Sequence, residues 1–178
     1  MTRPPDFGSA GGAGGAPKQE PHAITSTLFE PEFIARLALM FEERIAFNRV
    51  LGLRIVSLEA ETVGMRIEMR PELIGHFTHQ RLHGGVISAV LDAAAGLAVM
   101  AAIGARHLHE TIDERLARFA KLGTIDLRVD YLRPATGTHF GASAEVMRLG
   151  SRVASTRMAF HDAQGKLLST GAAAYIVA

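Results

Sequence analysis

One stretch of the sequence constrains the fold more than any other: His83–Ala105, which reads HGGVISAVLDAAAGLAVMAAIGA. Apart from His83, its single ionisable residue is Asp92. The stretch is long enough for a helix of about 20 residues, or about 30 Å, and a helix that is apolar on every face must be buried on every side. We therefore expect a long central helix that the rest of the protein encloses.

A membrane span is the competing interpretation of this stretch, because its length is close to what a bilayer requires. Asp92 lies near the middle of it, where an acidic residue costs about 2.5–3.5 kcal/mol on insertion. Alanine and glycine, which dominate the stretch, also supply little membrane hydrophobicity. The sequence therefore favours the core helix of a soluble protein.

The segments around this helix predict an α+β fold with an antiparallel sheet. An apolar stripe with three-and-four spacing predicts an amphipathic helix over Pro31–Phe47, and a second, short helix is expected within Leu108–Leu122. We expect a loop over Glu72–Leu82. Alternating or β-branched-rich runs predict six strands, the last four of them forming a meander: Leu51–Leu58, Thr62–Arg70, Thr124–Arg133, Phe140–Leu149, Arg152–His161 and Lys166–Val177.

Length and composition fit a single globular domain with a tail. The chain has 178 residues, of which 48% are hydrophobic and 21% charged, with a formal net charge of +1. Residues 1–24, rich in Gly and Pro, predict a disordered tail without the apolar core of a signal peptide, and residues 25–178 predict the folded domain. No basic field points to nucleic acid. The absence of cysteine excludes a thiolate nucleophile and favours the cytoplasm only weakly.

The all-round apolar character of the central helix also bears on assembly. A sheet covers a helix on one side, and one small domain offers no second cover. We therefore predict a homodimer in which a partner subunit supplies it.

Asp92 is the first candidate for chemistry, because a carboxylate among apolar side chains is either held by donors or serves as a base or nucleophile. The alternative is a buried Asp that merely pairs with a neighbouring element. Gly84 and Gly85 begin the same helix, where free N–H groups and the helix dipole favour an oxyanion. The alternative for these glycines is a tight turn into the helix.

Spacing connects the two candidates to the dimer. Gly84 and Asp92 are eight residues apart, or about 12 Å along one helix. Both would have to lie about 3 Å from one reacting carbonyl to cooperate. Two antiparallel copies of the helix across a twofold axis bring Gly84 of one subunit beside Asp92 of the other.

The segments Leu82–Asp92 and Gly123–Pro134 resemble those of hotdog-fold thioesterases of the PaaI-like family. The nearest likeness is to bacterial medium- to long-chain acyl-CoA thioesterases, and it extends over about Phe33 to Val177, including Arg148–Ala154. The resemblance implies a hotdog fold, an antiparallel sheet wrapped around a long central helix. It also implies hydrolysis by water of acyl-CoA thioesters, with a medium-chain, long-chain or aryl acyl group, to free acid and CoA.

The resemblance also implies roles for individual residues. Asp92 is the general base or nucleophile, Gly84 donates its backbone N–H to the thioester oxygen from the partner subunit, and Thr124 helps to position the water or the Asp. The family often has an Asn six residues before the His, where this chain has Phe77. Gln80 is close enough in the loop to replace it.

The remaining substrate-binding candidates are His83, Gly85 and three arginines suited to CoA phosphates, namely Arg133, Arg148 and Arg152. His83 either offers a ring N–H to the active site or holds the loop by bonding to backbone. Two histidine clusters resemble metal sites, His76/His79/His83 and His107/His109/Glu110. Because the first falls in a loop and the second suits a helix C-terminus, we expect no metal and no cofactor.

Two other functions remain open on the same fold, because fold does not determine function. One is a non-catalytic protein that binds acyl-CoA or fatty acid, and the other is a hotdog dehydratase or hydratase, which would require a paired Asp and His. The expected assembly is a homodimer that pairs into a tetramer, as the family often does. We expect no nucleic acid partner and no membrane span.

Overall fold

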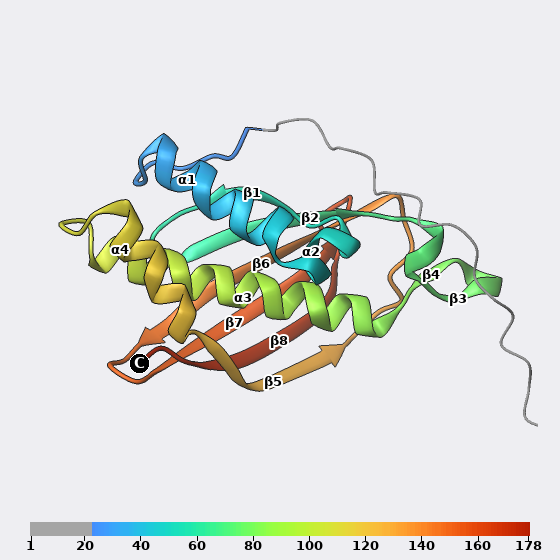
Figure 1. The fold of residues 1–178 in the computed structure, drawn as a ribbon. Helices are drawn as coiled ribbons and strands as arrows, with labels where there is room; N and C mark the ends of the chain where they lie inside the picture. Colours follow the sequence, from blue (N-terminus) through green and yellow to red (C-terminus); the bar gives the residue numbers. More distant parts are fainter. Residues whose placement is uncertain (1–22) are drawn as a thin grey trace, which may run out of the picture.

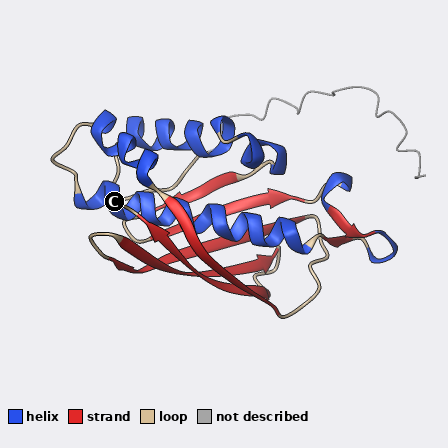
Figure 2. Cartoon of the chain, turned by 60° about the horizontal axis from the view of Figure 1, so that its bottom comes forward, coloured by secondary structure: helices blue, strands red, loops and turns tan. Residues whose placement is uncertain are grey.

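The long apolar helix lies against one face of an antiparallel sheet (Figures 1 and 2). In the computed structural model, which describes residues 23–178, this helix is α3 (Gly84–Arg106). It begins and ends within one residue of the predicted boundaries. Of its most apolar 18-residue window, 72% is buried, so α3 is the core helix of the domain, as the sequence predicts.

Six strands form the sheet, in the order β1-β2-β6-β7-β8-β5 and with every neighbouring pair antiparallel. Their bounds are β1 (Arg54–Leu58), β2 (Thr62–Glu68), β5 (Gly123–Tyr131), β6 (His139–Leu149), β7 (Val153–Asp162) and β8 (Leu167–Ile176). Alternate residues of β2, β6 and β7 are buried, because one face of these strands meets α3 and the other faces outward.

The predicted four-strand meander is wrong in one respect. β6, β7 and β8 are consecutive neighbours, but β5 pairs with β8 at the edge of the sheet and β6 pairs with β2. Alternation identifies the buried face of a strand and not its neighbours. The connection 132–138 passes two strands, and its length is ample for the distance of about 14 Å that three strand spacings require.

The N-terminal helix is interrupted, whereas the sequence predicts one helix over Pro31–Phe47. The segment comprises α1 (Pro31–Ala38), a π-helix (Leu39–Arg44) and α2 (Ala46–Leu51). Ile45 is extended, and the buried Asn48 side chain donates to the Phe41 carbonyl at 2.9 Å across the break. Gly52 then adopts the left-handed conformation that ends α2, so the first strand begins at Arg54 and not at Leu51.

These helices cover α3 on the side away from the sheet (Figure 1). The buried Phe33 of α1 lies against Gly104, and the run Ala94–Gly104 is buried throughout within one chain. The argument that one small domain cannot enclose the helix is therefore wrong for its C-terminal half. Val86, Ala89 and Ala93 in the N-terminal half remain partly exposed.

The expected short helix is present as α4 (Ile112–Ala117), followed by a 3-10 turn (Arg118–Lys121). Thr111 and Glu114 form a capping box at its start. The expected loop Glu72–Leu82 contains more structure than predicted, because β3 (Ile74–His76) and β4 (Arg81–Leu82) form a small hairpin that projects beside the start of α3 (Figure 1).

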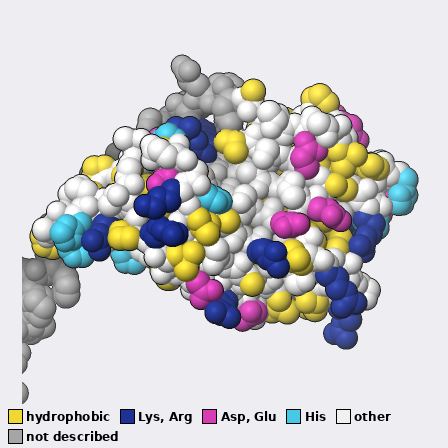
Figure 3. Space-filling model, turned by 180° about the vertical axis from the view of Figure 1, so that it is seen from behind, with side chains coloured by type: hydrophobic (Ala, Val, Ile, Leu, Met, Phe, Trp, Pro, Cys, Tyr) yellow, Lys and Arg dark blue, Asp and Glu magenta, His cyan; other side chains and the backbone are white. Residues whose placement is uncertain are grey.

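The outer face of the sheet carries charged side chains of both signs. Seen from behind, acidic and basic groups are interspersed with apolar and small residues (Figure 3). A shallow hollow of about 740 Å³ is lined there by Arg128, Asp130, Glu145 and Arg157, among others. The predicted tail over residues 1–24 lies outside the described residues except for Ala23 and Ile24.

The contact between α1 and α3 predicts opposite effects of one substitution at two positions. A methyl group at Gly104 would lie 2.8 Å from the Phe33 ring, whereas one at Gly96 meets no atom closer than 3.7 Å. We expect Gly104→Ala to lower the free energy of unfolding by about 1–3 kcal/mol through overpacking. Gly96→Ala should raise it by about 0.5–1 kcal/mol, because alanine is the better helix former. Urea unfolding measures both, and equal effects at the two positions would contradict the packing described.

Candidate active site

Asp92 lies at the middle of α3 with its side chain held by two hydroxyl groups. The Thr124 hydroxyl donates to Asp92 Oδ1 at 3.0 Å, and the Tyr175 hydroxyl lies 2.7 Å from the same oxygen. Thr124 was singled out from the sequence, and the structure brings it to Asp92 from β5. The carboxylate thus has donors, as a charged group with little access to water requires.

Tyr175, on β8, is the residue that sequence reasoning missed. Its ring is 2% exposed, and its hydroxyl is also 2.8 Å from the backbone carbonyl of Asp92. Burial and then the charge and hydrogen bonding of Asp92 hold the pKa of the Tyr175 phenol well above its ordinary value. The alternation in β8 predicts an inward Tyr, but no local pattern reveals that it meets Asp92.

An apolar pocket of about 280 Å³ opens beside the carboxylate. Asp92, Thr124 and Tyr175 form its polar wall. The rest of the lining is mostly hydrophobic and comes from the π-helix, α2, α3 and the segment before β5: Phe41, Ile45, Phe47, Asn48, Ala89, Ala93, Gly96, Phe119, Leu122 and Gly123. A pocket with an apolar lining and one cluster of polar groups is typical of a small-molecule site.

The start of α3 forms a separate group of the predicted residues. His83 is the N-cap, and its Nδ1 accepts a hydrogen bond from the Gly85 N–H at 2.9 Å. This bond agrees with the interpretation that His83 holds the loop by bonding to backbone. The Gly84 carbonyl accepts from the Tyr131 hydroxyl at 2.9 Å, and the first N–H groups of the helix have no acceptor within it.

Gln80 and Phe77 lie in the hairpin beside this helix start. The Gln80 side chain donates to the Phe77 carbonyl at 2.7 Å, and the Phe77 ring is 82% exposed. The Gln80 side chain therefore stabilises the turn that contains it, between β3 and β4. The structure does not bring it to Asp92, because β3 and β4 lie beyond the N-terminal end of α3 (Figure 1).

The three arginines expected to bind CoA lie at two ends of the subunit. Arg133 follows β5 and donates to the Leu167 carbonyl at 2.8 Å, on the side of Gly84. Arg148 and Arg152 flank the turn between β6 and β7, which approaches the C-terminal end of α3 where Arg106 donates to the Leu149 carbonyl.

A second, larger pocket of about 670 Å³ adjoins that turn. Leu149, Gly150 and Ser151 contribute to its wall, and the cations Arg106, Arg118 and Lys121 line it together with Glu110 and Glu114. Basic groups therefore gather around the turn that carries Arg148 and Arg152.

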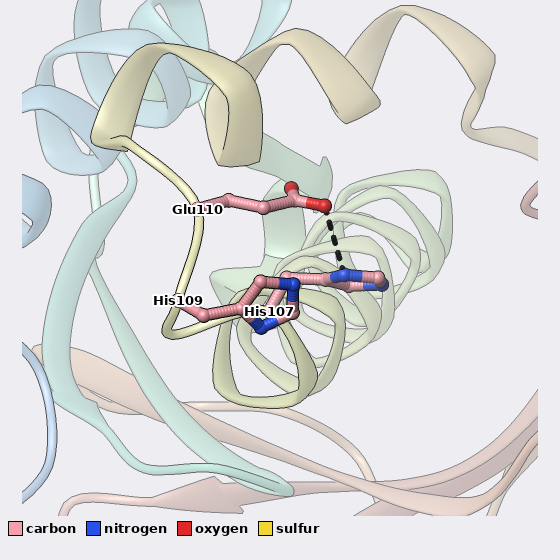
Figure 4. Close-up of side chains that lie close together, drawn as sticks. All are labelled: His107, His109 and Glu110. Atoms are coloured by element: carbon pink, nitrogen blue, oxygen red, sulfur yellow. Dashed lines mark ion pairs between the residues drawn. The ribbon is translucent and has the colours of Figure 1, made fainter.

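The cluster at the end of α3 has the residues of a metal site but not its electrostatics. His107, His109 and Glu110 place one ligand atom each within 4.8 Å of the others (Figure 4). However, Arg118 donates to both Glu110 oxygens, at 2.5 and 2.9 Å, and holds the pKa of that carboxyl below its ordinary value. The carboxylate is thus already neutralised by a guanidinium, which would repel a metal cation.

Comparison with known proteins identifies the family of this chain. Residues 79–169 match the model of the thioesterase superfamily. The chain is 38% identical over 154 residues to a protein of Escherichia coli K12 named medium/long-chain acyl-CoA thioesterase YigI, covering 86% of this chain and 99% of that one. The chain belongs to the thioesterase superfamily.

Solved structures agree with this assignment. A thioesterase-superfamily protein of Shewanella oneidensis is 41% identical and superimposes with a TM-score of 0.77, covering 83% of this chain and 96% of that one. The PaaI protein from the phenylacetic acid degradation operon of E. coli, at 18% identity and a TM-score of 0.66, shares the fold over 83% of this chain and 94% of its own. The thioesterase thus has the hotdog fold that the sequence predicts, and it is an enzyme of thioester hydrolysis.

The cap at the start of α3 yields a prediction that separates the two roles considered for His83. His83→Ala removes the acceptor of the Gly85 N–H and should lower the free energy of unfolding by about 1 kcal/mol, whereas Asn, a good N-cap, should retain most of it. Activity should follow stability, so that His83→Asn hydrolyses thioester at nearly the wild-type rate. If the Asn variant is stable but as slow as the Ala variant, the ring acts on substrate.

Proposed function

We propose that this thioesterase hydrolyses acyl-CoA with medium to long acyl chains, using Asp92 as its general base or nucleophile. The observation that carries the proposal is the Asp92 carboxylate, held by two hydroxyls in the wall of an otherwise apolar pocket. The substrate class is supported by the 38% identity to the E. coli enzyme named for medium and long chains. An apolar pocket next to a carboxylate suits an acyl chain whose thioester ends at the carboxylate.

The reaction needs a nucleophile and a place for negative charge. In one route Asp92 takes a proton from water while the water oxygen attacks the thioester carbon and the carbonyl oxygen becomes negative; the C–S bond then breaks, and the proton passes from Asp92 to the sulfur so that CoA leaves as the thiol. In the other, the Asp92 oxygen attacks the thioester carbon, the C–S bond breaks to release the CoA thiolate, and water then cleaves the resulting anhydride to the free acid and Asp92. Both routes place an oxyanion where a backbone N–H can stabilise it.

The oxyanion donor in this proposal is Gly84 of the partner subunit. Within one subunit Gly84 and Asp92 lie eight residues apart on α3, or about 12 Å, too far to act on one carbonyl. An antiparallel α3 across a twofold axis places the partner's Gly84 beside Asp92. The site is then shared between two subunits.

Two surfaces support this dimer. β5 is a nine-residue edge strand, and large apolar side chains along it and just after it are exposed: Ile125 58%, Leu127 37%, Tyr131 54% and Leu132 50%. A long, apolar edge strand favours pairing with another strand. The partly exposed half of α3, with Val86, Ala89 and Ala93, belongs to the same side of the subunit because β5 packs beside it.

CoA recognition in this proposal falls to the basic groups around the β6–β7 turn. Arg148 and Arg152 border a pocket that Arg106, Arg118 and Lys121 line, and phosphates favour bidentate guanidinium groups. The twofold would also bring Arg133 of the partner subunit toward this end, together with the partner's Gly84.

Asp92→Asn tests the proposed chemistry. An amide cannot take a proton or attack as a carboxylate does, so the rate of CoA release from a good acyl-CoA should fall by about 10²–10⁴-fold or more. A thiol-detecting assay over acyl-CoA of increasing chain length measures this. The control is Glu61→Gln, which makes the same change at an exposed carboxylate between β1 and β2, far from β5 in the sheet and outside the pocket lining.

Two outcomes would overturn the proposal in different ways. Wild-type turnover by Asp92→Asn would exclude Asp92 from the chemistry. Saturable acyl-CoA binding by the wild-type protein without thiol release at any chain length would instead identify a binding protein.

A charge at the exposed edge strand tests the shared site. Leu127→Glu should convert the dimer to monomers, which light scattering measures. It should also abolish most of the activity, because each monomer lacks the partner's Gly84. Val56→Glu is the matched control, since Val56 is 38% exposed on β1 at the opposite edge of the sheet. A monomeric Leu127→Glu protein with full activity would show that one subunit contains the whole site.

A further inference from the structure

The structure assigns Tyr175 the role of a positioning residue that orients the Asp92 carboxylate for attack. This inference rests on the proposed function of Asp92. It concerns how the carboxylate is held, and its test can fail while Asp92 remains essential.

The first support is the geometry of two hydroxyls on one oxygen. Thr124 and Tyr175 both approach Asp92 Oδ1, at 3.0 and 2.7 Å. Their bonds define the rotation of the carboxyl group about its last torsion, which is broad when unrestrained. The other oxygen, Oδ2, is thereby left for the water or the thioester carbon.

The second support is the sheet register. Thr124 of β5 and Tyr175 of β8 are directly paired positions, and a bulge follows immediately between Thr124 and Asp126. Directly paired residues have their Cβ atoms about 4.5–5.5 Å apart on the same face. One pair of opposite residues in the sheet thus carries both donors, and backbone hydrogen bonds between the two strands determine their relative position.

The third support is that Tyr175 is built into the core with its hydroxyl against Asp92. Its ring is 2% exposed, and its hydroxyl meets both Oδ1 and the backbone carbonyl of Asp92. One phenol proton serves one acceptor at a time, and the charged carboxylate makes the stronger bond. Gly96, one turn after Asp92 on α3, lies beside the ring, and a methyl group there would make an ordinary contact with it at 3.7 Å.

The phenol also stays protonated as this role requires. Burial and the adjacent Asp92 charge raise the pKa of Tyr175, so the hydroxyl remains a donor over the working pH range. Of the described residues that line the pocket, Asp92 and Tyr175 are the titratable ones.

Tyr175→Phe tests the inference, because it removes one oxygen and keeps the ring. A hydrogen bond to a charged group corresponds to about 10- to 100-fold in rate, so kcat should fall by about that factor with KM nearly unchanged. Since a donor favours the ionised carboxylate, its loss should move the acidic limb of the kcat/KM profile to higher pH. In an Asp92→Asn background the same change should have no further effect on kcat.

Thr156→Val is the matched control for lost stability. Thr156 is a buried residue of β7 whose hydroxyl donates to the Ala173 carbonyl at 3.3 Å, away from Asp92. It should lower the thermal midpoint about as much as Tyr175→Phe does and leave the pH profile unmoved. If Tyr175→Phe behaves as Thr156→Val does, Tyr175 is purely structural and the inference fails.

A fluorinated tyrosine tests the same bond in the opposite direction and without removing it. The chain has two tyrosines, so global incorporation in a Tyr131→Phe background labels Tyr175 alone. Fluorination makes the phenol a stronger donor, and the acidic limb should move to lower pH than in the unlabelled Tyr131→Phe protein. An unmoved limb would contradict the inference even if Tyr175→Phe did not fold, whereas full activity of Asp92→Asn would refute the proposed function instead.

Discussion

The enclosure of α3 is the constraint on which the rest of the structure depends. A helix of such apolar composition is stable in water only when other elements cover it. The sheet covers one side. On the other, α1 and α4 lie along the C-terminal half of α3, while the π-helix and α2 lie beside Ala89 and Ala93 in the wall of the pocket. The N-terminal half is covered incompletely, and it is there that Gly84 and Asp92 lie. The uncovered surface and the residues proposed to act in catalysis thus lie on the same half of one helix.

Much of this could be predicted from the sequence because the signals are local. Helical length, strand alternation and the Gly-Gly before an apolar run depend on neighbours in the chain, and α3 and the six strands agree with prediction. The contact of Thr124 with Asp92 is an expectation from the family resemblance and not from a local pattern. The strand order could not be predicted, because alternation carries no information on partners. The interruption at Ile45 depends on a buried bond from Asn48 to Phe41, which is a tertiary contact.

Tyr175 shows why the site was predicted only in part. A tyrosine in an alternating strand is ordinarily a core residue with its hydroxyl at the margin. Its meeting with Asp92 results from the packing of β8 against α3, and the pairing of β5 with β8, which the predicted meander lacked, brings Thr124 beside it. Both contacts depend on which elements lie together, and alternation within a strand carries no information on that. The cover of α3 by the chain's own N-terminal helices was missed for a related reason, because packing partners distant in sequence leave no local pattern.

The division of α3 into two halves has an evolutionary consequence. The effect of a substitution in the run Ala94–Gly104 depends on packing within one subunit, since the chain covers that run by itself. The effect of a substitution around Val86, Ala89 or Ala93 depends on what contacts the partly exposed N-terminal half of α3 and on the shape of the pocket beside it. The two halves can therefore vary under separate selection, and a lineage can remodel its substrate pocket while the folding of each subunit is left intact.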